Sequence, residues 1–320
     1  MTSLEAASFG GQILTATPRS VARIVNPKEA TMTEQDRYIP GVPCWLDMTP
    51  PDPDAAAAFY ADLFGWEVED VMPPGAPGRY LVGRIGGRDV AAIGSSPDGA
   101  AAAWNTYVWV ESADATAERV RSAGGRVLSG PEDVGDNGRM AVCADTEGAT
   151  FSLWEAGRHR GAAAVNEHGT VNFNDLYARD LEAARAFYGA VFGWTVLDLG
   201  GPGGMMWTLP GYGDFLERRS PGMLENMASM GAPEGFADVV GSLLLAEDGA
   251  ARWGVTFAVD DADAIAARTA ELGGRVVVPP FDAPWVRMTF LVDPQGAPFT
   301  ASRFAPENKD LPQASGAATA

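Results

Sequence analysis

The stretch DPDAAAAFYADLFGWEV, at residues 52–68, decides the fold of this chain, because it returns as DLEAARAFYGAVFGWTV at residues 180–196. The two copies lie 128 residues apart throughout, without a gap. Self-similarity at a fixed spacing is the signature of a protein built from repeated structural units. The structure expected for one copy is therefore expected for the other copy as well.

Each copy has the pattern of a short helix between strands. In the first copy, residues at helical spacing are apolar, namely Ala55, Ala58, Phe59 and Leu63. Asp52, or Asp54 two residues on, is a suitable N-cap for this helix. Gly65 is expected to end it, because glycine adopts positive φ without strain. Trp66 then begins the next strand.

A second pattern repeats between these copies. SADATAERVRSAGGRVLSGPED at 112–133 matches DADAIAARTAELGGRVVVPPFD at 261–282, with an offset of 149 residues. DTEGATFSLWE at 145–155 matches DPQGAPFTASR at 293–303 at nearly the same offset. Each helix is followed by three short strand patterns, so the chain is interpreted as four βαβββ modules of an α+β fold.

The module boundaries follow from these matches. Modules 1 to 4 are placed at about 43–97, 104–157, 169–218 and 252–305. Residues 1–38 match no module and are predicted to be a disordered N-terminal arm, as residues 306–320 are predicted to be a disordered tail. Residues 158–168 are Gly/Ala-rich and are predicted to be a linker between domains 39–157 and 169–305.

Composition excludes several classes of protein. Apolar residues make up 46% of the 320 residues, enough for each half to bury its own core. No secretory signal and no long apolar run is present, so a cytoplasmic protein is expected. The net charge of −19 argues against nucleic acid and anionic membranes as partners; it serves solubility, or attracts cationic ligands.

Cys44 and Cys143 fall in apolar strand patterns and are expected to be reduced core thiols.

These motifs identify a family resemblance. A strand followed by D-x-x-x-A-x-x-F-Y-x-x-x-F-G-W resembles the vicinal oxygen chelate superfamily, which includes glyoxalase I, extradiol dioxygenases and bleomycin-resistance proteins. The FYADLFGWEV and FYGAVFGWTV segments are most similar to tandem glyoxalase-like proteins of actinobacteria, over about residues 40–157 and 169–305. The resemblance implies that modules 1 and 2 pair, as do modules 3 and 4, and that each pair curls around a cleft.

The resemblance also implies where a metal ion would be held. The family's ligand positions carry other residue types in this chain, namely Trp45, Asn105 and Ser152 in the first domain and Phe173, Gly254 and Thr300 in the second. The remaining position falls near residues 91–96, which have no ligand side chain. Divalent metals usually need three or more N, O or S donors. No metal and no other cofactor is therefore expected. The two histidines, His159 and His168, lie in the linker and are expected to be solvated.

Strand alternation predicts what lines the clefts instead. In the first domain the predicted set is Trp45, Asp47, Asn105, Tyr107, Trp109, Ser152 and Trp154. In the second it is Phe173, Asp175, Tyr177, Trp207, Thr256, Thr300 and Ser302. Aromatic walls with one carboxylate suit a flat, partly polar or cationic ligand. Two alternatives stay open: the aromatics are core, or each carboxylate pairs with an arginine such as Arg139 or Arg287.

Three classes of function fit this interpretation. The first is metal-independent binding of a planar aromatic or polyketide-like compound, for resistance or specialised metabolism. The second is a metal-free isomerase, cyclase or lyase, or an oxygenase accessory, with Asp47 or Asp175 as general base and Tyr107 or Tyr177 assisting. The third is a partner protein without a ligand. A monomer or homodimer is expected.

One segment, residues 218–240, has no counterpart in the first domain. Met223, Met227 and Met230 recur in it at helical spacing, and methionine adapts well to ligand surfaces. The segment is interpreted as a lid over the second cleft or the domain seam, or as simple surface packing.

Overall fold

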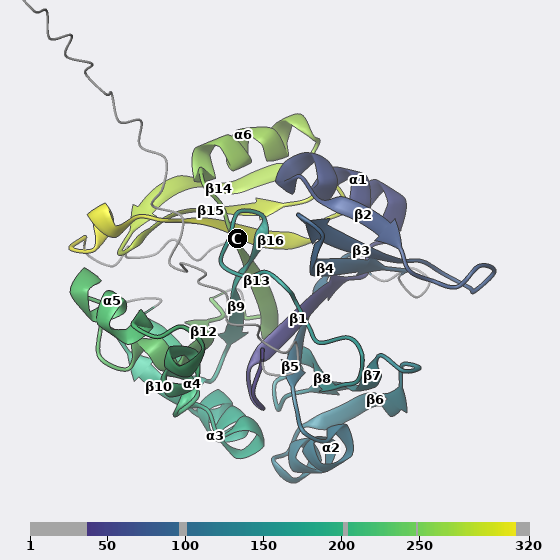
Figure 1. Ribbon diagram of the computed structural model, residues 1–320, viewed down its shortest axis with the longest axis horizontal. Coiled ribbons are helices and arrows are strands. Elements are labelled where there is room, and N and C mark those ends of the chain that lie inside the picture. Colours follow the sequence, from purple (N-terminus) through teal and green to yellow (C-terminus); the bar gives the residue numbers. More distant parts are fainter. Residues whose placement is uncertain (1–36, 96–100, 201–203, 248, 312–320) are drawn as a thin grey trace, which may run out of the picture. The chain divides into compact units, whose positions relative to one another are not determined.

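The computed structural model describes residues 37–95, 101–200, 204–247 and 249–311 (Figure 1). Within these residues the chain forms two eight-stranded sheets, each carrying two of the repeated helices. No helix in this part of the chain is long and apolar enough to span a bilayer.

The first sheet is built from modules 1 and 2. Its elements are β1 (Pro43–Met48), α1 (Pro53–Phe64), β2 (Glu67–Asp70), β3 (Tyr80–Ile85), β4 (Arg88–Gly94), β5 (Trp104–Trp109), α2 (Ala113–Ser122), β6 (Arg126–Asp133), β7 (Gly138–Ala144) and β8 (Thr150–Ala156). The strand order is β2-β3-β4-β1-β5-β8-β7-β6, and antiparallel pairing of β1 with β5 joins the modules. The predicted pairing of modules 1 and 2 is confirmed.

The second sheet repeats this order. Its elements are β9 (Thr170–Ala178), α3 (Leu181–Phe192), β10 (Thr195–Asp198), β11 (Met205–Thr208), β12 (Val239–Leu245), β13 (Arg252–Ala258), α6 (Ala262–Glu271), β14 (Arg275–Ala283), β15 (Val286–Val292) and β16 (Pro298–Phe304). The order is β10-β11-β12-β9-β13-β16-β15-β14. Each domain therefore has the βαβββ–βαβββ topology expected from the repeat.

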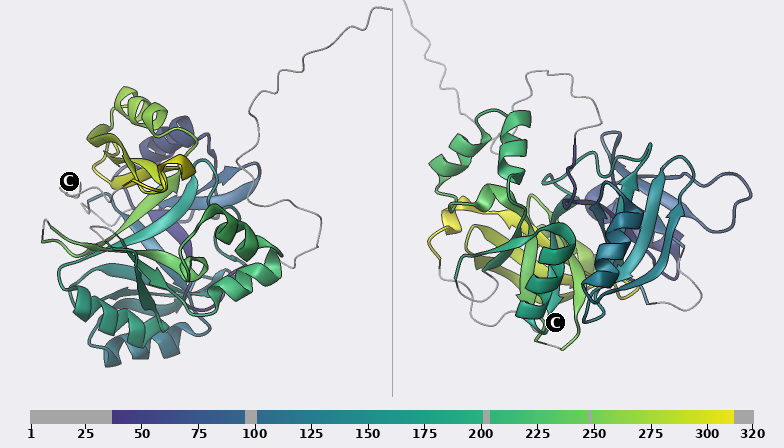
Figure 2. Two further views of the ribbon diagram at one scale, coloured as in Figure 1. Left: turned by 90° about the vertical axis from the view of Figure 1, so that its left-hand side faces the viewer. Right: turned by 90° about the horizontal axis from the view of Figure 1, so that it is seen from below.

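Module 3 ends later than predicted. Its last strand is β12, which follows an insertion made of α4 (Tyr212–Arg219), α5 (Met223–Met230) and the 3-10 turn η2 (Phe236–Asp238). The insertion separates two strands that are hydrogen-bonded neighbours, so the boundary placed at residue 218 was wrong. Figure 2 shows the green helices α4 and α5 side by side at the edge of the second domain.

The helix boundaries predicted from the repeated stretch are confirmed. Asp52 caps α1 by accepting a hydrogen bond from the Ala55 amide at 3.0 Å, and Asp180 caps α3 in the same way. Gly65 ends α1 with a φ of 73°, and Gly193 ends α3 with a φ of 76°. Left-handed backbone at this position is costly for residues with a Cβ, so the two glycines are required by geometry.

The helix-bearing faces of the two sheets pack against each other. Helix α1 contacts α6, and α2 contacts α3, and one hydrophobic cluster is formed mainly by modules 1 and 4 while another is formed mainly by modules 2 and 3 (Figure 1). Between the sheets, the Thr106 hydroxyl donates to the Asn174 side-chain oxygen at 2.8 Å. This bond satisfies a polar side chain on a face that alternation marks as buried. Both cysteines are free, buried thiols, as predicted.

The ordered chain extends beyond both predicted ends. Tyr38, assigned to the arm, is 8% exposed and donates to the Ala162 carbonyl at 2.9 Å. At the other end, Pro306–Asn308 form a 3-10 turn, and the Asn308 amide donates to the Val286 carbonyl. The physical reason is the same at both ends, because each segment satisfies its polar groups on the folded domains. The rest of the arm and tail lies outside the described residues.

A pair of truncations tests how far the arm matters. A chain beginning at Arg37 is expected to melt within about 2 °C of the full chain, whereas one beginning at Ile39 should lose about 1–3 kcal/mol, because it lacks the buried Tyr38 ring. Thermal unfolding of the three chains measures this. A large loss already in the chain that begins at Arg37 would place residues 1–36 in the core.

Candidate functional site

The strand register places the predicted cleft residues of the first domain on one face. Asp47 lies opposite Asn105, and Trp45 lies opposite Tyr107 across the β1–β5 pair. The next strand continues this face, since Ser152 and Trp154 lie beside Tyr107 and Trp109. Seven side chains predicted from alternation alone therefore face the same way.

Asp47 is the centre of this face. Its carboxyl accepts hydrogen bonds from the Tyr107 hydroxyl at 2.7 Å, the Asn105 amide at 2.8 Å and the Tyr80 hydroxyl at 3.3 Å. The side chain is buried, and burial raises the pKa of the carboxyl against the opposing effect of these three donors. Every one of these donors is neutral, so no ion pair is among the hydrogen bonds of this carboxyl.

Tyr80 is a cleft residue that the sequence analysis missed. It lies on β3, where it accepts from the Trp45 indole at 3.1 Å and donates to Asp47. The register of β3 with β4 puts it on the same face as Val82. Alternation within β3 indicates which of its residues share a face. Deciding that this face is the one that carries Asp47 also requires the order of the strands, which the sequence does not give.

The linker packs onto the predicted cleft face of the first domain. The His159 ring packs edge-on against Trp45, with centroids 4.3 Å apart, and against Trp154 at 5.6 Å. The Trp154 indole donates to the His159 carbonyl at 3.0 Å. Both tryptophans are consequently at most 5% exposed. The prediction that His159 is solvated was therefore wrong, because its ring packs against two tryptophan rings and its Nε2 atom is buried.

The second cleft has a corresponding carboxyl in a simpler setting. Asp175 is 6% exposed and accepts from the Thr256 hydroxyl at 2.6 Å and from Ser242. Burial raises its pKa, and the two hydroxyl donors act in the opposite direction. Thr300 and Ser302 continue the same polar floor on β16.

The walls of the second cleft are more open than those of the first. Phe173 and Tyr177, on the face of Asp175, are half-buried, and so are Met288 and Phe290 on β15. The register pairs Met288 with Ser302 and Phe290 with Thr300, which puts these two side chains on the cleft face. The second domain thus presents a buried carboxyl on a sheet face that also carries partly exposed aromatic and methionine side chains.

Trp207 does not line this cleft. It is fully buried on the opposite face of β11, where its ring packs 5.5 Å from both Tyr188 and Trp194. The assignment failed because the four-residue strand MMWT shows no alternation. Its neighbour Met206 pairs with Ser242, so these two residues occupy the cleft face instead.

Neither cleft carboxyl pairs with the arginines considered from the sequence. Arg139 binds Asp114 and Asp133, and Arg287 binds the equivalent Asp263 and Asp282 on the surface. The groups that donate to Asp47 and Asp175 in the described chain are hydroxyl and amide groups. The carboxyls therefore remain candidates for contact with a ligand.

Comparison with known proteins identifies the family. The chain matches the Glyoxalase/Bleomycin resistance protein/Dioxygenase superfamily over residues 45–153 and 170–300. It belongs to this superfamily. The two matched regions coincide with the two sheets, which confirms the fold class and the resemblance inferred from the repeats.

Curated relatives within the superfamily span most of the chain. A protein named putative glyoxylase CFP32, from Mycobacterium tuberculosis, is 38% identical over 286 residues, covering 86% of this chain and all of the relative. The anthracycline biosynthesis protein DnrV of Streptomyces peucetius is 36% identical, covering 82% of this chain and 94% of the relative.

Solved structures share the fold at low identity. The Mn(II)-bound glyoxalase from Novosphingobium aromaticivorans superposes with a TM-score of 0.55 at 17% identity, covering 83% of each chain. The 2,3-dioxygenase LapB from Pseudomonas sp. KL28 gives 0.53 at 12% identity, covering 83% of this chain and 93% of that one. At these identities the likeness concerns the fold alone.

The residues at the superfamily's metal positions do not suit a metal. Trp45 uses its indole nitrogen as a donor to Tyr80, Phe173 and Gly254 have no donor atom, and Thr300 offers a neutral hydroxyl. Among the described residues, no group of three or more His, Cys, Asp or Glu side chains could hold a metal ion. One carboxyl per cleft among neutral groups does not meet the need for several anionic or imidazole ligands.

We expect neither cleft to bind a transition metal. Protein purified from metal-supplemented cells should carry less than about 0.1 equivalent of zinc, iron or manganese per chain, because the donor set is too small. Elemental analysis before and after dialysis against a chelator measures this. Near one equivalent of metal per domain, lost together with ligand binding on chelation, would contradict the expectation.

The inserted helices lie at one end of the second cleft. Strand β12 begins where the insertion ends and runs parallel to β9, while the β14–β15 turn reaches the same end of the sheet. One side of α5 is half-buried, formed by Met223, Leu224, Met227 and Met230. Its ends are marked by Gly222 and Gly231 at φ values of 91° and 86°. This position agrees with the lid hypothesis, which remains a prediction.

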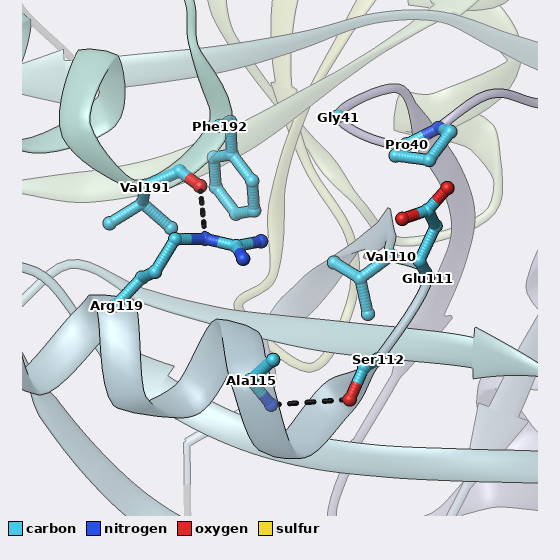
Figure 3. A pocket seen from close by; sticks show the side chains of 9 residues that line it. All are labelled: Pro40, Gly41, Val110, Glu111, Ser112, Ala115, Arg119, Val191 and Phe192. Carbon is cyan, nitrogen blue, oxygen red and sulfur yellow. Dashed lines mark hydrogen bonds between the residues drawn. The ribbon is translucent and has the colours of Figure 1, made fainter.

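A small cavity lies away from both cleft faces, between α2, the end of α3 and residues 40–41 (Figure 3). Its volume is about 140 Å³. Arg119 crosses it to donate to the Val191 carbonyl at 3.1 Å, and Ser112 at its edge caps α2. Sites for drug-sized ligands usually enclose roughly 300–1,000 Å³, so this cavity is better described as an imperfection of the domain interface.

Proposed function

We propose that the second domain binds a planar aromatic small molecule of the polyketide type, without a metal ion, and serves specialised metabolism or resistance. The observation that carries the proposal is the buried Asp175 carboxyl, which has neutral hydroxyl partners and lies below the half-buried Phe173 and Tyr177. Aromatic walls favour a flat ring system, and a carboxyl at the base favours an amine or hydroxyl on it.

The relative DnrV supports the choice of ligand class. Its name assigns it to anthracycline biosynthesis, and anthracyclines are flat, multi-ring polyketides that carry an amino sugar. Such a compound would match both features of the second cleft, since the rings stack on aromatic side chains and the amine pairs with the carboxylate. A role on an anthracycline-like compound is therefore the function that we propose.

Binding of an anthracycline tests the proposal directly. Daunorubicin at about 100 times its Kd should stabilise the native chain by about 2.7 kcal/mol, seen as a higher melting temperature. Titration calorimetry should give one site per chain. A single-ring phenol and an aliphatic amine serve as matched controls, and neither should bind comparably. Equal effects of all three compounds, or none, would contradict the proposal.

A second candidate is a metal-free enzyme with Asp175 as general base. The observation that favours it is burial, which raises the pKa of this carboxyl toward the range in which a base works at neutral pH. Binding and catalysis are separated by the fate of the ligand. Recovery of the bound compound unchanged after prolonged incubation supports sequestration, whereas conversion that Asp175→Asn abolishes supports the enzyme.

A further inference from the structure

The linker between the domains is fastened to the first domain at both ends. We call residues 157–164 the linker strap. At its start, the amides of Gly157 and His159 donate to the Asn137 carbonyl at 2.8 and 3.1 Å. At its end, the amide of Ala162 donates to the Cys44 carbonyl at 2.8 Å. The strap therefore runs across the first cleft as an ordered segment.

Gly161 allows the strap to approach β1 closely. Its φ is 79°, and a Cβ at this position would lie 2.5 Å from the Cys44 carbonyl oxygen. A glycine is required on both grounds, because backbone atoms cannot move aside as a flexible side chain can. Ala162 follows with 1% exposure, so the strap is packed against the domain as tightly as the core.

The His159 ring contacts two tryptophan side chains of the predicted cleft face of the first domain. Its ring meets the Trp45 and Trp154 rings edge-on, at interplanar angles of 79° and 71°. These tryptophans belong to the same face as the Asp47 carboxyl. The chain thus supplies its own ring to the aromatic part of the first cleft.

The His159 imidazole does not satisfy all of its hydrogen-bonding groups in this position. Its Nε2 atom is buried and has no hydrogen-bond partner among the described residues, which is unfavourable for a polar group. Burial lowers the pKa of His159 and the nearby Asp89 acts in the opposite direction, so the ring that fits this place is neutral. Asp89 itself is bound by Arg84 at 2.6 Å. A neutral aromatic ring without a buried, unpartnered nitrogen avoids this cost, so it should be able to displace the His159 imidazole from between Trp45 and Trp154.

We propose that the first cleft is a second ligand site, held closed by the linker strap, and that it takes a flat, neutral aromatic ring in place of the His159 imidazole. Asp47, with Tyr80, Tyr107 and Asn105 around it, would then face a polar group of that ligand. This site does not depend on the proposed function of the second cleft, because no residue is shared.

Removing the imidazole tests whether the space that it occupies can bind another aromatic ring. His159→Gly should bind imidazole or indole at one site per chain, with a Kd on the order of 1 mM or tighter, whereas the unmodified chain should show none at these concentrations. His168→Gly is the matched control, because His168 is half-exposed in the same linker, and it should bind neither ring. No binding to folded His159→Gly, checked by circular dichroism, would overturn the proposal. His159→Gln, which keeps a polar side chain there, should bind more weakly than His159→Gly.

Displacement of the strap in the unmodified chain tests whether the site can open. Arg158 and Arg160 flank His159, so trypsin cleaves the strap when it leaves the cleft. Indole at concentrations well above those of the binding experiment should accelerate cleavage there about fivefold or more, because indole binds the open form and proteolysis follows the population of that form. Cleavage after Arg126 and Arg275 should not change. Gly161→Ala should accelerate strap cleavage without any ligand. Strap cleavage that indole leaves unchanged would show that the linker is a permanent part of the first domain.

Discussion

Replacing Asp175 with asparagine should weaken binding of a cationic planar ligand at least tenfold, about 1.4 kcal/mol, while the fold stays as stable as before or becomes more stable. The substitution keeps the shape of the side chain and removes its charge. The hydrogen bond from Thr256 can still be accepted by the amide oxygen, so little packing is lost. Binding affinity and unfolding free energy, measured on the same protein, separate the two effects.

The pH dependence of this variant follows from the direction of the pKa shift. Burial raises the pKa of Asp175 in the folded chain above its unfolded value of about 3.9. A raised pKa means that the neutral carboxyl is favoured by folding. Its contribution to stability is therefore complete below about pH 4 and is lost as the pH rises through the folded pKa. Asp175→Asn lacks this loss, so its relative stability should improve as the pH rises from 4 to 8.

Asp47→Asn is the matched control for ligand binding. It removes an equivalent carboxyl from the first cleft, which His159 closes, so the affinity of the second cleft should not change. Destabilisation of Asp175→Asn by several kcal/mol with intact binding would contradict the prediction. Asp175 would then be a structural group, since breaking a buried polar arrangement carries that cost.

The positions of Asp47 and Asp175 could be predicted from the sequence because two simple rules fix them. The 128-residue repeat makes the two residues equivalent, and alternation along β1 and β9 puts both on the face away from the helices. The register confirms this placement. Their roles in binding or catalysis remain predictions.

The difference between the two clefts could not be predicted in the same way. The linker has no periodicity, so nothing in its sequence indicates that His159 folds back between Trp45 and Trp154. Ser242 was missed for a related reason. An insertion of two helices separates β12 from the rest of module 3, and a repeat search ends where the repeat is interrupted. Contacts between distant segments, and not local patterns, decide these features.

The repeated stretch also carries a contact between domains that its helical pattern does not reveal. Tyr60 of α1 and Tyr188 of α3 stand at the same place in the two copies, and both are fully buried. Tyr60 donates to Asp293 of the second domain at 3.2 Å, and Tyr188 donates to Asp145 of the first at 3.1 Å. Each domain thus contributes one tyrosine and one aspartate to a pair of equivalent clamps.

Both clamps are anchored on each side. Trp104 donates to the Tyr60 hydroxyl oxygen at 3.2 Å, and Trp253 donates to that of Tyr188 at 3.0 Å. The aspartates in turn hold the turns between the last two strands of modules 2 and 4, since their other carboxyl oxygen accepts from backbone amides at 2.8–2.9 Å. The clamps therefore connect the helix of one domain to the sheet of the other.

Removing both tyrosine hydroxyls should cost about 2–6 kcal/mol of unfolding free energy. Each of Tyr60→Phe and Tyr188→Phe leaves a buried indole N–H without its acceptor and removes one donor to a buried carboxyl, at about 1–3 kcal/mol per site. The two sites share no residue, so their costs should add in the double variant. Chemical denaturation of the single and double variants measures this. Tyr212→Phe is the control, because Tyr212 is half-buried on α4 and takes no part in either clamp.

The shape of the unfolding transition tests the role of the clamps more sharply than its midpoint. If the clamps join the two domains into one cooperative unit, the unmodified chain unfolds in a single transition, and the double variant unfolds in two. The reason is that each clamp joins a fully buried tyrosine of one domain to a buried aspartate of the other, within an interface otherwise formed by the two hydrophobic clusters and by hydrogen bonds such as that from Thr106 to Asn174. A double variant that loses less than about 0.5 kcal/mol and keeps one transition would show that the clamps are not needed to hold the domains together.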